Sequence, residues 1–140
     1  MICKKNLGKE ERMPNPIIFI SNQKIKAGQL DEYKKNYLQV AAMTEATKPG
    51  TAAHLAYLNE EGTKASIVHI FPDVESLEVH LRGVDELAKK AYQFMEIESF
   101  EIYGRPSDKI LAGMMQIAGS GVTLDIKPQS VGGYIRLKSR

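Results

Sequence analysis

The chain of 140 residues contains no tryptophan and a single cysteine, Cys3. One cysteine excludes a framework of intrachain disulfides and any metal site built from several thiolates. No apolar run approaches the roughly 20 residues that cross a bilayer. Residues 1–13 also lack the apolar central region of a secretory signal. We therefore expect a cytoplasmic protein that has no membrane partner.

A strong charge of one sign is also missing. The 19 basic and 17 acidic residues are interspersed and leave a net charge of +2. Because contact with nucleic-acid phosphates needs a continuous basic face, we expect no nucleic-acid partner. Apolar residues make up 43% of the chain and charged residues 26%, which is typical of one globular domain of this length.

Short strand-like runs alternate with segments of helical periodicity. Four runs are rich in β-branched or aromatic residues and predict strands over residues 17–20, 53–58, 65–71 and 97–103. Apolar residues spaced by three and four predict a helix over residues 29–47. Asp73 is a typical N-cap and begins a second helical region that continues to Phe94.

The order β-α-β-β-α-β predicts an α+β domain of the ferredoxin-like type over residues 14–106. We expect residues 1–13 to form a disordered N-terminal tail. In residues 107–140, Ser107 caps a predicted helix, and an alternating strand over residues 122–127 follows. We expect this C-terminal helix-strand appendix to pack on the same domain.

The predicted strands are apolar on both sides. The first strand, for example, places Ile18 and Ile20 on one side and Phe19 on the other. Helices of one protomer cover only one face of such a sheet, so the other face needs a different cover. We expect a homodimer that packs sheet against sheet, since two-fold closure is the commonest oligomer. The alternative is that the C-terminal appendix covers this face.

Residues 17–103 resemble the antibiotic-biosynthesis-monooxygenase-like family. The resemblance lies in the order of three strings, Lys26-Ala27-Gly28, Lys48-Pro49-Gly50 and Phe71-Pro72-Asp73-Val74-Glu75-Ser76-Leu77-Glu78-Val79-His80-Leu81. It implies a ferredoxin-like βαββαβ fold that forms a dimeric α+β barrel. It also implies, for some members, an oxygenase without a cofactor that acts on quinols or phenols.

A related branch of this family degrades haem. Asn22 and Phe71 stand where that branch has an asparagine and a tryptophan, but the chain has no tryptophan. We therefore do not expect haem degradation.

Two histidines are candidates for chemistry. If the loop from Asn59 to Lys64 is symmetric, positions summing to 123 pair, so His54 faces His69 across the hairpin. A bulge at Gly62 would shift this register by one. Facing imidazoles can hold a proton or supply two metal ligands. No acidic third ligand is evident on these strands, so we expect no metal; the alternative role is that of sheet histidines bonded to neighbours or to the partner chain.

Other candidates are His80, Asn22, Phe71, Tyr33 and Tyr37. His80 lies at the edge of the apolar stripe of its helix and is a candidate acid–base group. Asn22 is a candidate to orient a ligand oxygen at the end of the first strand. Phe71, Tyr33, Tyr37 and His54 are candidates to contact a ligand. The structural alternatives are a half-buried helical histidine, a strand-end amide and ordinary core packing.

The leading hypothesis is a cofactor-independent oxygenase of a small phenolic or quinol substrate. In it, His80 or His69 takes a proton from the substrate, with Asn22 beside them, in an apolar pocket. We expect no cofactor. The alternative is a non-catalytic ligand-binding or stress-response module that holds a small apolar or aromatic ligand in the same fold.

Overall fold

The computed structural model describes residues 15–137, except residues 83 and 120. The elements in chain order are β1 (Ile17–Ile25), α2 (Leu30–Thr47), β2 (Ala53–Leu58), β3 (Lys64–Phe71), α3 (Val74–Leu81), α4 (Val84–Ala91), β4 (Met95–Tyr103), α5 (Asp108–Ala118) and β5 (Thr123–Lys127). This order confirms the predicted α+β, ferredoxin-like fold. The predicted tail, residues 1–13, lies outside the described residues.

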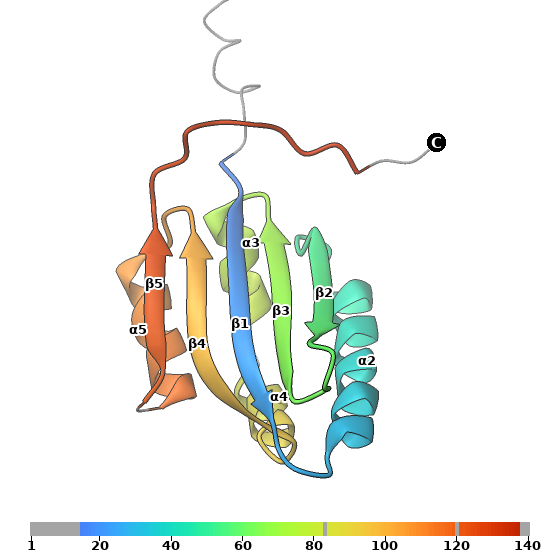
Figure 1. The fold of residues 1–140 in the computed structure, drawn as a ribbon. Coiled ribbons are helices and arrows are strands. Elements are labelled where there is room, and N and C mark those ends of the chain that lie inside the picture. Colours follow the sequence, from blue (N-terminus) through green and yellow to red (C-terminus); the bar gives the residue numbers. More distant parts are fainter. Residues whose placement is uncertain (1–14, 83, 120, 138–140) are drawn as a thin grey trace, which may run out of the picture.

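One sheet carries all five strands in the order β2-β3-β1-β4-β5. The pairs β2–β3, β3–β1 and β1–β4 are antiparallel, and β4–β5 is parallel. Figure 1 shows β5 at one edge of this sheet and β2 at the other. The C-terminal appendix thus adds a fifth strand to the sheet, beside β4.

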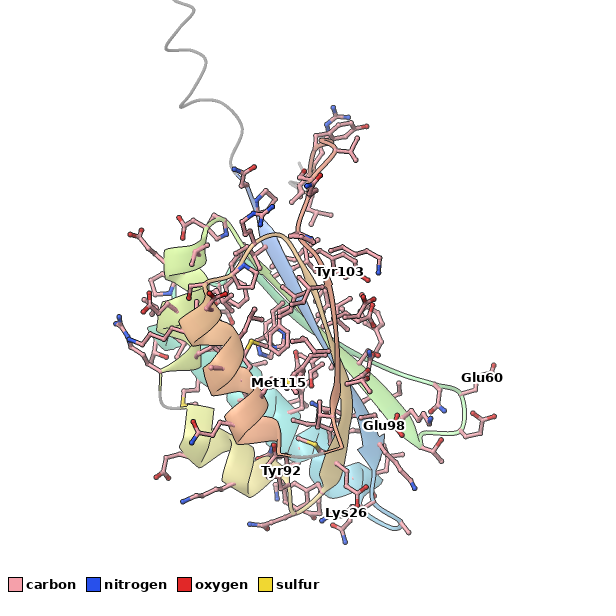
Figure 2. The ribbon with its side chains drawn as sticks, turned by 90° about the vertical axis from the view of Figure 1, so that its left-hand side faces the viewer. Lys26, Glu60, Tyr92, Glu98, Tyr103 and Met115 are labelled. Atoms are coloured by element: carbon pink, nitrogen blue, oxygen red, sulfur yellow. The ribbon has the colours of Figure 1, made fainter. Side chains whose placement is uncertain are left out.

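The helices lie on one face of the sheet, as Figure 2 shows edge-on. We call this the helical face and the other the open face. Two clusters of buried apolar side chains fill the space between the layers. The larger contains Ile17, Phe19, Phe71, Leu77, Phe100, Ile102, Ile110 and Met114. The smaller contains Ile25, Tyr33, Ala65 and Met95. The core therefore consists of two separate clusters, which lie at different positions along the strands.

Strand β1 is longer than predicted. The apolar run ends at Ile20, but the strand continues to Ile25 because Ser21 and Gln23 alternate onto the helical face and are buried there. Its pairing with β4 shifts between Asn22 and Gln23, which marks a β-bulge. Asn22 therefore lies inside a strand and not at its end, which corrects the sequence prediction.

Two predicted helix caps are confirmed. The side chain of Asp73 accepts a hydrogen bond from the backbone N–H of Ser76 at the start of α3. Ser107 accepts one from the N–H of Ile110 at the start of α5. Each cap satisfies a donor that has no partner within its helix. Among the described residues, no helix is both long and apolar enough to cross a membrane.

Candidate functional site

A cavity of about 130 Å³ lies between α2 and the sheet. Helix α2 supplies one wall, and strands β1, β2 and β3 supply the other. The lining residues are Gln23, Tyr33, Asn36, Tyr37, Val40, Thr44, Lys48, His54, Ile67, His69, His80, Ala91 and Met95. The cavity therefore combines an apolar surface with a few polar groups, which is typical of small-molecule sites.

All three histidines of the chain meet at this cavity. The predicted register is confirmed, because His54 of β2 pairs directly with His69 of β3, and their ring centroids are 4.6 Å apart. His80 of α3 approaches from the helical layer, with its ring centroid 5.6 Å from that of His54 and 5.1 Å from that of His69. One ring nitrogen from each histidine lies within 4.8 Å of the other two. We call these residues the histidine cluster.

Each imidazole is held through Nδ1 by an oxygen atom. Nδ1 of His69 lies 2.9 Å from the carbonyl oxygen of Phe19. A carbonyl oxygen only accepts, so Nδ1 of His69 carries a proton and Nε2 of the neutral ring has a lone pair. Nδ1 of His80 lies 3.1 Å from Oγ1 of Thr51, and Nδ1 of His54 lies 2.8 Å from the hydroxyl of Tyr37. These contacts fix the orientation of each ring.

The histidine cluster is neutral at physiological pH. Burial, followed by the positive charge of Lys48, lowers the pKa of His80 to about 3 and that of His54 to about 4. The pKa of His69 lies well below its ordinary value because of burial and the nearby His54 and His80, although the bond to Phe19 opposes this. The cavity thus presents proton acceptors that are not protonated in advance.

Lys48, which follows α2 and lines the cavity, forms hydrogen bonds to the C-terminal end of α3. Its ammonium group donates hydrogen bonds to the carbonyl oxygens of His80 and Arg82, and its pKa is lowered by burial. Because the ammonium group still carries a positive charge at neutral pH, the cavity favours a ligand that gains negative charge.

A buried chain of polar groups also borders the cavity. Tyr33 donates from its hydroxyl to Oε1 of Gln23 at 2.6 Å, and Nε2 of Gln23 donates to Oγ of Ser21 at 3.0 Å. Burial raises the pKa of both Tyr33 and Tyr37. Both phenols therefore remain protonated at neutral pH and act as hydrogen-bonding groups.

The structure brings together most of the site residues named from the sequence. His54, His69, His80, Tyr33 and Tyr37 line the cavity. Phe71 does not line it. Phe71 is fully buried behind the histidine cluster, and its ring centroid lies 5.2 Å from that of His80. Phe71 therefore packs against His80 and lies apart from the cavity, whereas from the sequence we expected it to contact a ligand there.

Asn22 does not join the cavity. It lies on the open face, where Nδ2 donates to Glu101 at 2.7 Å and to Ser99 at 3.1 Å, and Oδ1 accepts from Ser66 at 2.6 Å. The alternation of a strand places Phe19 and Asn22 on opposite faces. Orienting a ligand beside the histidine cluster is thus not a role for Asn22.

Three residues that line the cavity, Gln23, Asn36 and Lys48, and Thr51, which contacts His80, were missed by the sequence reasoning. Gln23 was missed because the predicted strand ended too early. Thr51 lies in the loop before β2, and Lys48 was read only as the end of a helix. Asn36 precedes Tyr37 on the buried side of α2, so the helical stripe could have indicated it.

Comparison with known proteins supports the fold. No family model matches the chain, and no curated protein matches it in sequence. Among solved structures, MupZ from Pseudomonas fluorescens is 18% identical, with a TM-score of 0.68 over 88% of this chain and 96% of that one. SnoaB, a cofactor-independent oxygenase from Streptomyces nogalater, is 14% identical, with a TM-score of 0.56 over 66% of this chain and 95% of that one.

A candidate antibiotic biosynthesis monooxygenase from Caulobacter crescentus is 16% identical, with a TM-score of 0.56 over 64% of this chain and 86% of that one. The chain shares the fold of the antibiotic biosynthesis monooxygenase-like proteins. The predicted resemblance is thus confirmed at the level of fold. MupZ covers more of the chain than the other two.

Proposed function

We propose that this protein is an oxygenase of a small, single-ring phenol or quinol and that it works without a cofactor. The observation that carries the proposal is the neutral histidine cluster at the wall of a largely apolar cavity. The likeness in fold to SnoaB, a cofactor-independent oxygenase, supports the same class of reaction.

The size of the cavity favours a single aromatic ring. A volume of about 130 Å³ is close to the roughly 150 Å³ of a cavity that accommodates benzene. Val40, Ile67 and Met95 offer apolar contacts to such a ring. The hydroxyl of the ring would lie toward Nε2 of His69, which has a lone pair, and toward the neighbouring ring of His80.

The first step is transfer of the phenolic proton to Nε2 of His69 or His80. The attraction between the phenolate and the imidazolium must offset burial and the charge of Lys48, both of which lower the pKa of His80 and so disfavour its protonated form. The phenolate then gives one electron to dioxygen, which produces a phenoxyl radical and superoxide. Removing the proton thus makes the ring electron-rich enough to react.

The two radicals combine at the ring carbon opposite the hydroxyl, and the imidazolium protonates the outer oxygen to give a hydroperoxide. Loss of the proton from this carbon and cleavage of the O–O bond release water and leave a quinone. The sum is one phenol and one O₂ to one quinone and one water. The substrate supplies all four electrons, so the reaction needs no external reductant.

The test is oxygen uptake with single-ring phenols and hydroquinones in the presence of a metal chelator. For the phenols we expect one quinone for each O₂ consumed, and His69→Ala or His80→Ala should lower kcat by about 10²–10⁴-fold. Glu98→Gln is a matched control, because Glu98 is part of an exposed ion pair with Lys64 (Figure 2). Uptake that both histidine variants leave unchanged would refute the mechanism.

The alternative, a ligand-binding module, has its own signature in the same experiment. A ligand that binds the folded state raises its thermal stability without turnover. Thermal stabilisation by the phenols together with no oxygen uptake would favour that alternative and reject the oxygenase.

We also propose that two copies associate through the open face. The large apolar side chains on this face are Ile18, Ile20, Leu55, Tyr57, Val68 and Ile70, from three adjacent strands. Leu55 is 46% exposed and Tyr57 62% exposed. Such a patch on a single chain is typical of a protein interface.

The C-terminal appendix leaves this patch uncovered within the described residues. Ile110 and Met114 of α5 pack into the core on the helical face, and β5 adds to the edge of the sheet. Residues 128–137 run past the ends of the strands (Figure 1). These positions favour a second copy as the cover of the open face.

Sedimentation velocity tests the dimer. We expect the wild-type particle to have twice the 15.6 kDa mass of the chain at micromolar concentration. Ile20→Lys should give a particle of 15.6 kDa, because it places a charge in the centre of the patch. Leu38→Lys is the control, since Leu38 is 67% exposed on α2. A wild-type monomer would contradict the proposal.

A further inference from the structure

We propose that the histidine cluster is a binding site for one divalent transition-metal ion, with Nε2 of His54, His69 and His80 as its three protein ligands. Among the described residues, this is the one group of three or more histidine, cysteine or acidic side chains whose possible ligand atoms lie close enough together to hold a metal ion. The inference concerns the protein without substrate and goes beyond the proposed oxygenase.

The first argument is how the rings are supported. Histidines that bind metals almost always use one nitrogen for the metal and the other for an oxygen partner that fixes the ring. Here the carbonyl of Phe19, the hydroxyl of Thr51 and the hydroxyl of Tyr37 each hold one Nδ1. All three imidazoles therefore have this second contact in place.

The second argument is that the Nε2 atoms of the three rings have no hydrogen-bond partner among the described residues. Nε2 of His69 has a lone pair, and the residue is buried at the wall of the cavity. A lone pair that has no donor from the protein is the kind of group that a cation satisfies.

The third argument is distance. One ring nitrogen from each histidine lies within 4.8 Å of the other two, so their common centre is at most about 2.8 Å from each, whereas a zinc–nitrogen bond is about 2.0–2.1 Å long. Each of these nitrogens would therefore move by about 0.7 Å or less to reach bonding distance. The cavity beside the cluster leaves the fourth position of a tetrahedral ion open.

The ligand set indicates which ions would bind. Three imidazoles without a carboxylate or thiolate suit Zn²⁺, Co²⁺, Ni²⁺ and Cu²⁺ and disfavour Mg²⁺ and Ca²⁺, which prefer oxygen ligands. From the sequence we considered only an acidic third ligand on the two strands. Here the third ligand is His80, which belongs to α3.

Metal binding and proton acceptance use the same lone pairs. An ion on the histidine cluster would thus exclude the first step of the proposed oxygenase and act as its inhibitor. The two ideas can fail separately, because metal binding is measured without substrate and oxygen uptake is measured with chelator present.

The experiment uses the full chain without a histidine tag, freed of metal by a chelator that is then removed by dialysis. Zn²⁺ is titrated against a chromophoric chelator, and Co²⁺ is added to record its visible absorption bands. We expect one ion per chain and the strong bands of four-coordinate cobalt. Thr51→Ala should weaken Zn²⁺ binding by about 10-fold, as loss of a supporting contact does.

Loss of a ligand should weaken binding more, by at least about 100-fold in His80→Gln and in His54→Gln. Using both variants keeps the test valid if one fails to fold, which circular dichroism would reveal. Cys3→Ser and Asp125→Asn are controls and should bind as the wild type does. Wild-type binding weaker than millimolar, or equal binding by the folded histidine variants, would overturn the proposal.

Discussion

Acid should destabilise this protein more than an ordinary domain of its size. His69 and His80 are less than a tenth exposed, and burial lowers the pKa of each below the ordinary value of about 6.5. As the pH falls below 6.5, the unfolded chain takes up protons that the folded chain refuses. The stabilising effect is therefore present above pH 6.5 and is lost as the pH falls toward the folded-state values.

The size of the loss follows from linkage. Between pH 7.5 and pH 5, a histidine that stays neutral in the folded state costs about 2 kcal/mol of unfolding free energy. His69 and His80 together lower the free energy of unfolding by about 4 kcal/mol between pH 7.5 and pH 5, and His54 lowers it further. The other titratable groups on the cavity wall are Tyr33, Tyr37 and Lys48, and none of them changes charge over this range. The loss is a large part of a typical stability of about 5–15 kcal/mol.

The assay is urea unfolding, followed by circular dichroism at fixed protein concentration, with chelator, at pH 7.5, 6.5 and 5. His80→Gln has no titratable group at that position, so its loss between pH 7.5 and 5 should be smaller than the wild-type loss by about 2 kcal/mol. A wild-type free energy of unfolding that changes by less than about 1 kcal/mol over this range would refute the reasoning.

Two further predictions concern the fold. Leu77→Ala should lower the free energy of unfolding by about 2–5 kcal/mol in urea denaturation, because the Leu77 side chain is fully buried in the larger core cluster; a loss below about 1 kcal/mol would contradict this packing. Asp73→Ala should cost about 1 kcal/mol in the same assay, because it removes the cap of α3. Asp73→Asn, which can still accept the bond, should retain most of the stability.

The hairpin register was predictable because its loop is closed locally. The backbone of Asn59 pairs with Lys64, and the side chain of Asn59 accepts from the N–H groups of Thr63 and Lys64. These contacts lie within six residues, so loop length alone indicated that His54 and His69 face each other. The element order was predictable for a similar reason, since caps and apolar spacing are local signals.

The meeting of the third histidine with the other two was not predictable from local patterns. The place of His80 depends on how α3 packs on the sheet, which is set by Leu77 and by the link from Lys48 to the carbonyl of His80. The side of the sheet on which Asn22 lies was equally unpredictable. The polar part of β1 gives no apolar alternation, so its end and the bulge beside Asn22 left no sequence signal.

The reactive groups and the shape of the cavity come from different stretches of the chain. All three imidazoles belong to residues 54–80, a hairpin and the helix that follows it, whereas α2 forms the facing wall. Replacing Val40 or Asn36 would therefore reshape the space for a ligand and leave the imidazoles in place. For the proposed oxygenase, directed evolution confined to α2 and sparing Tyr37 offers a route to new substrate preferences with the three imidazoles unaltered.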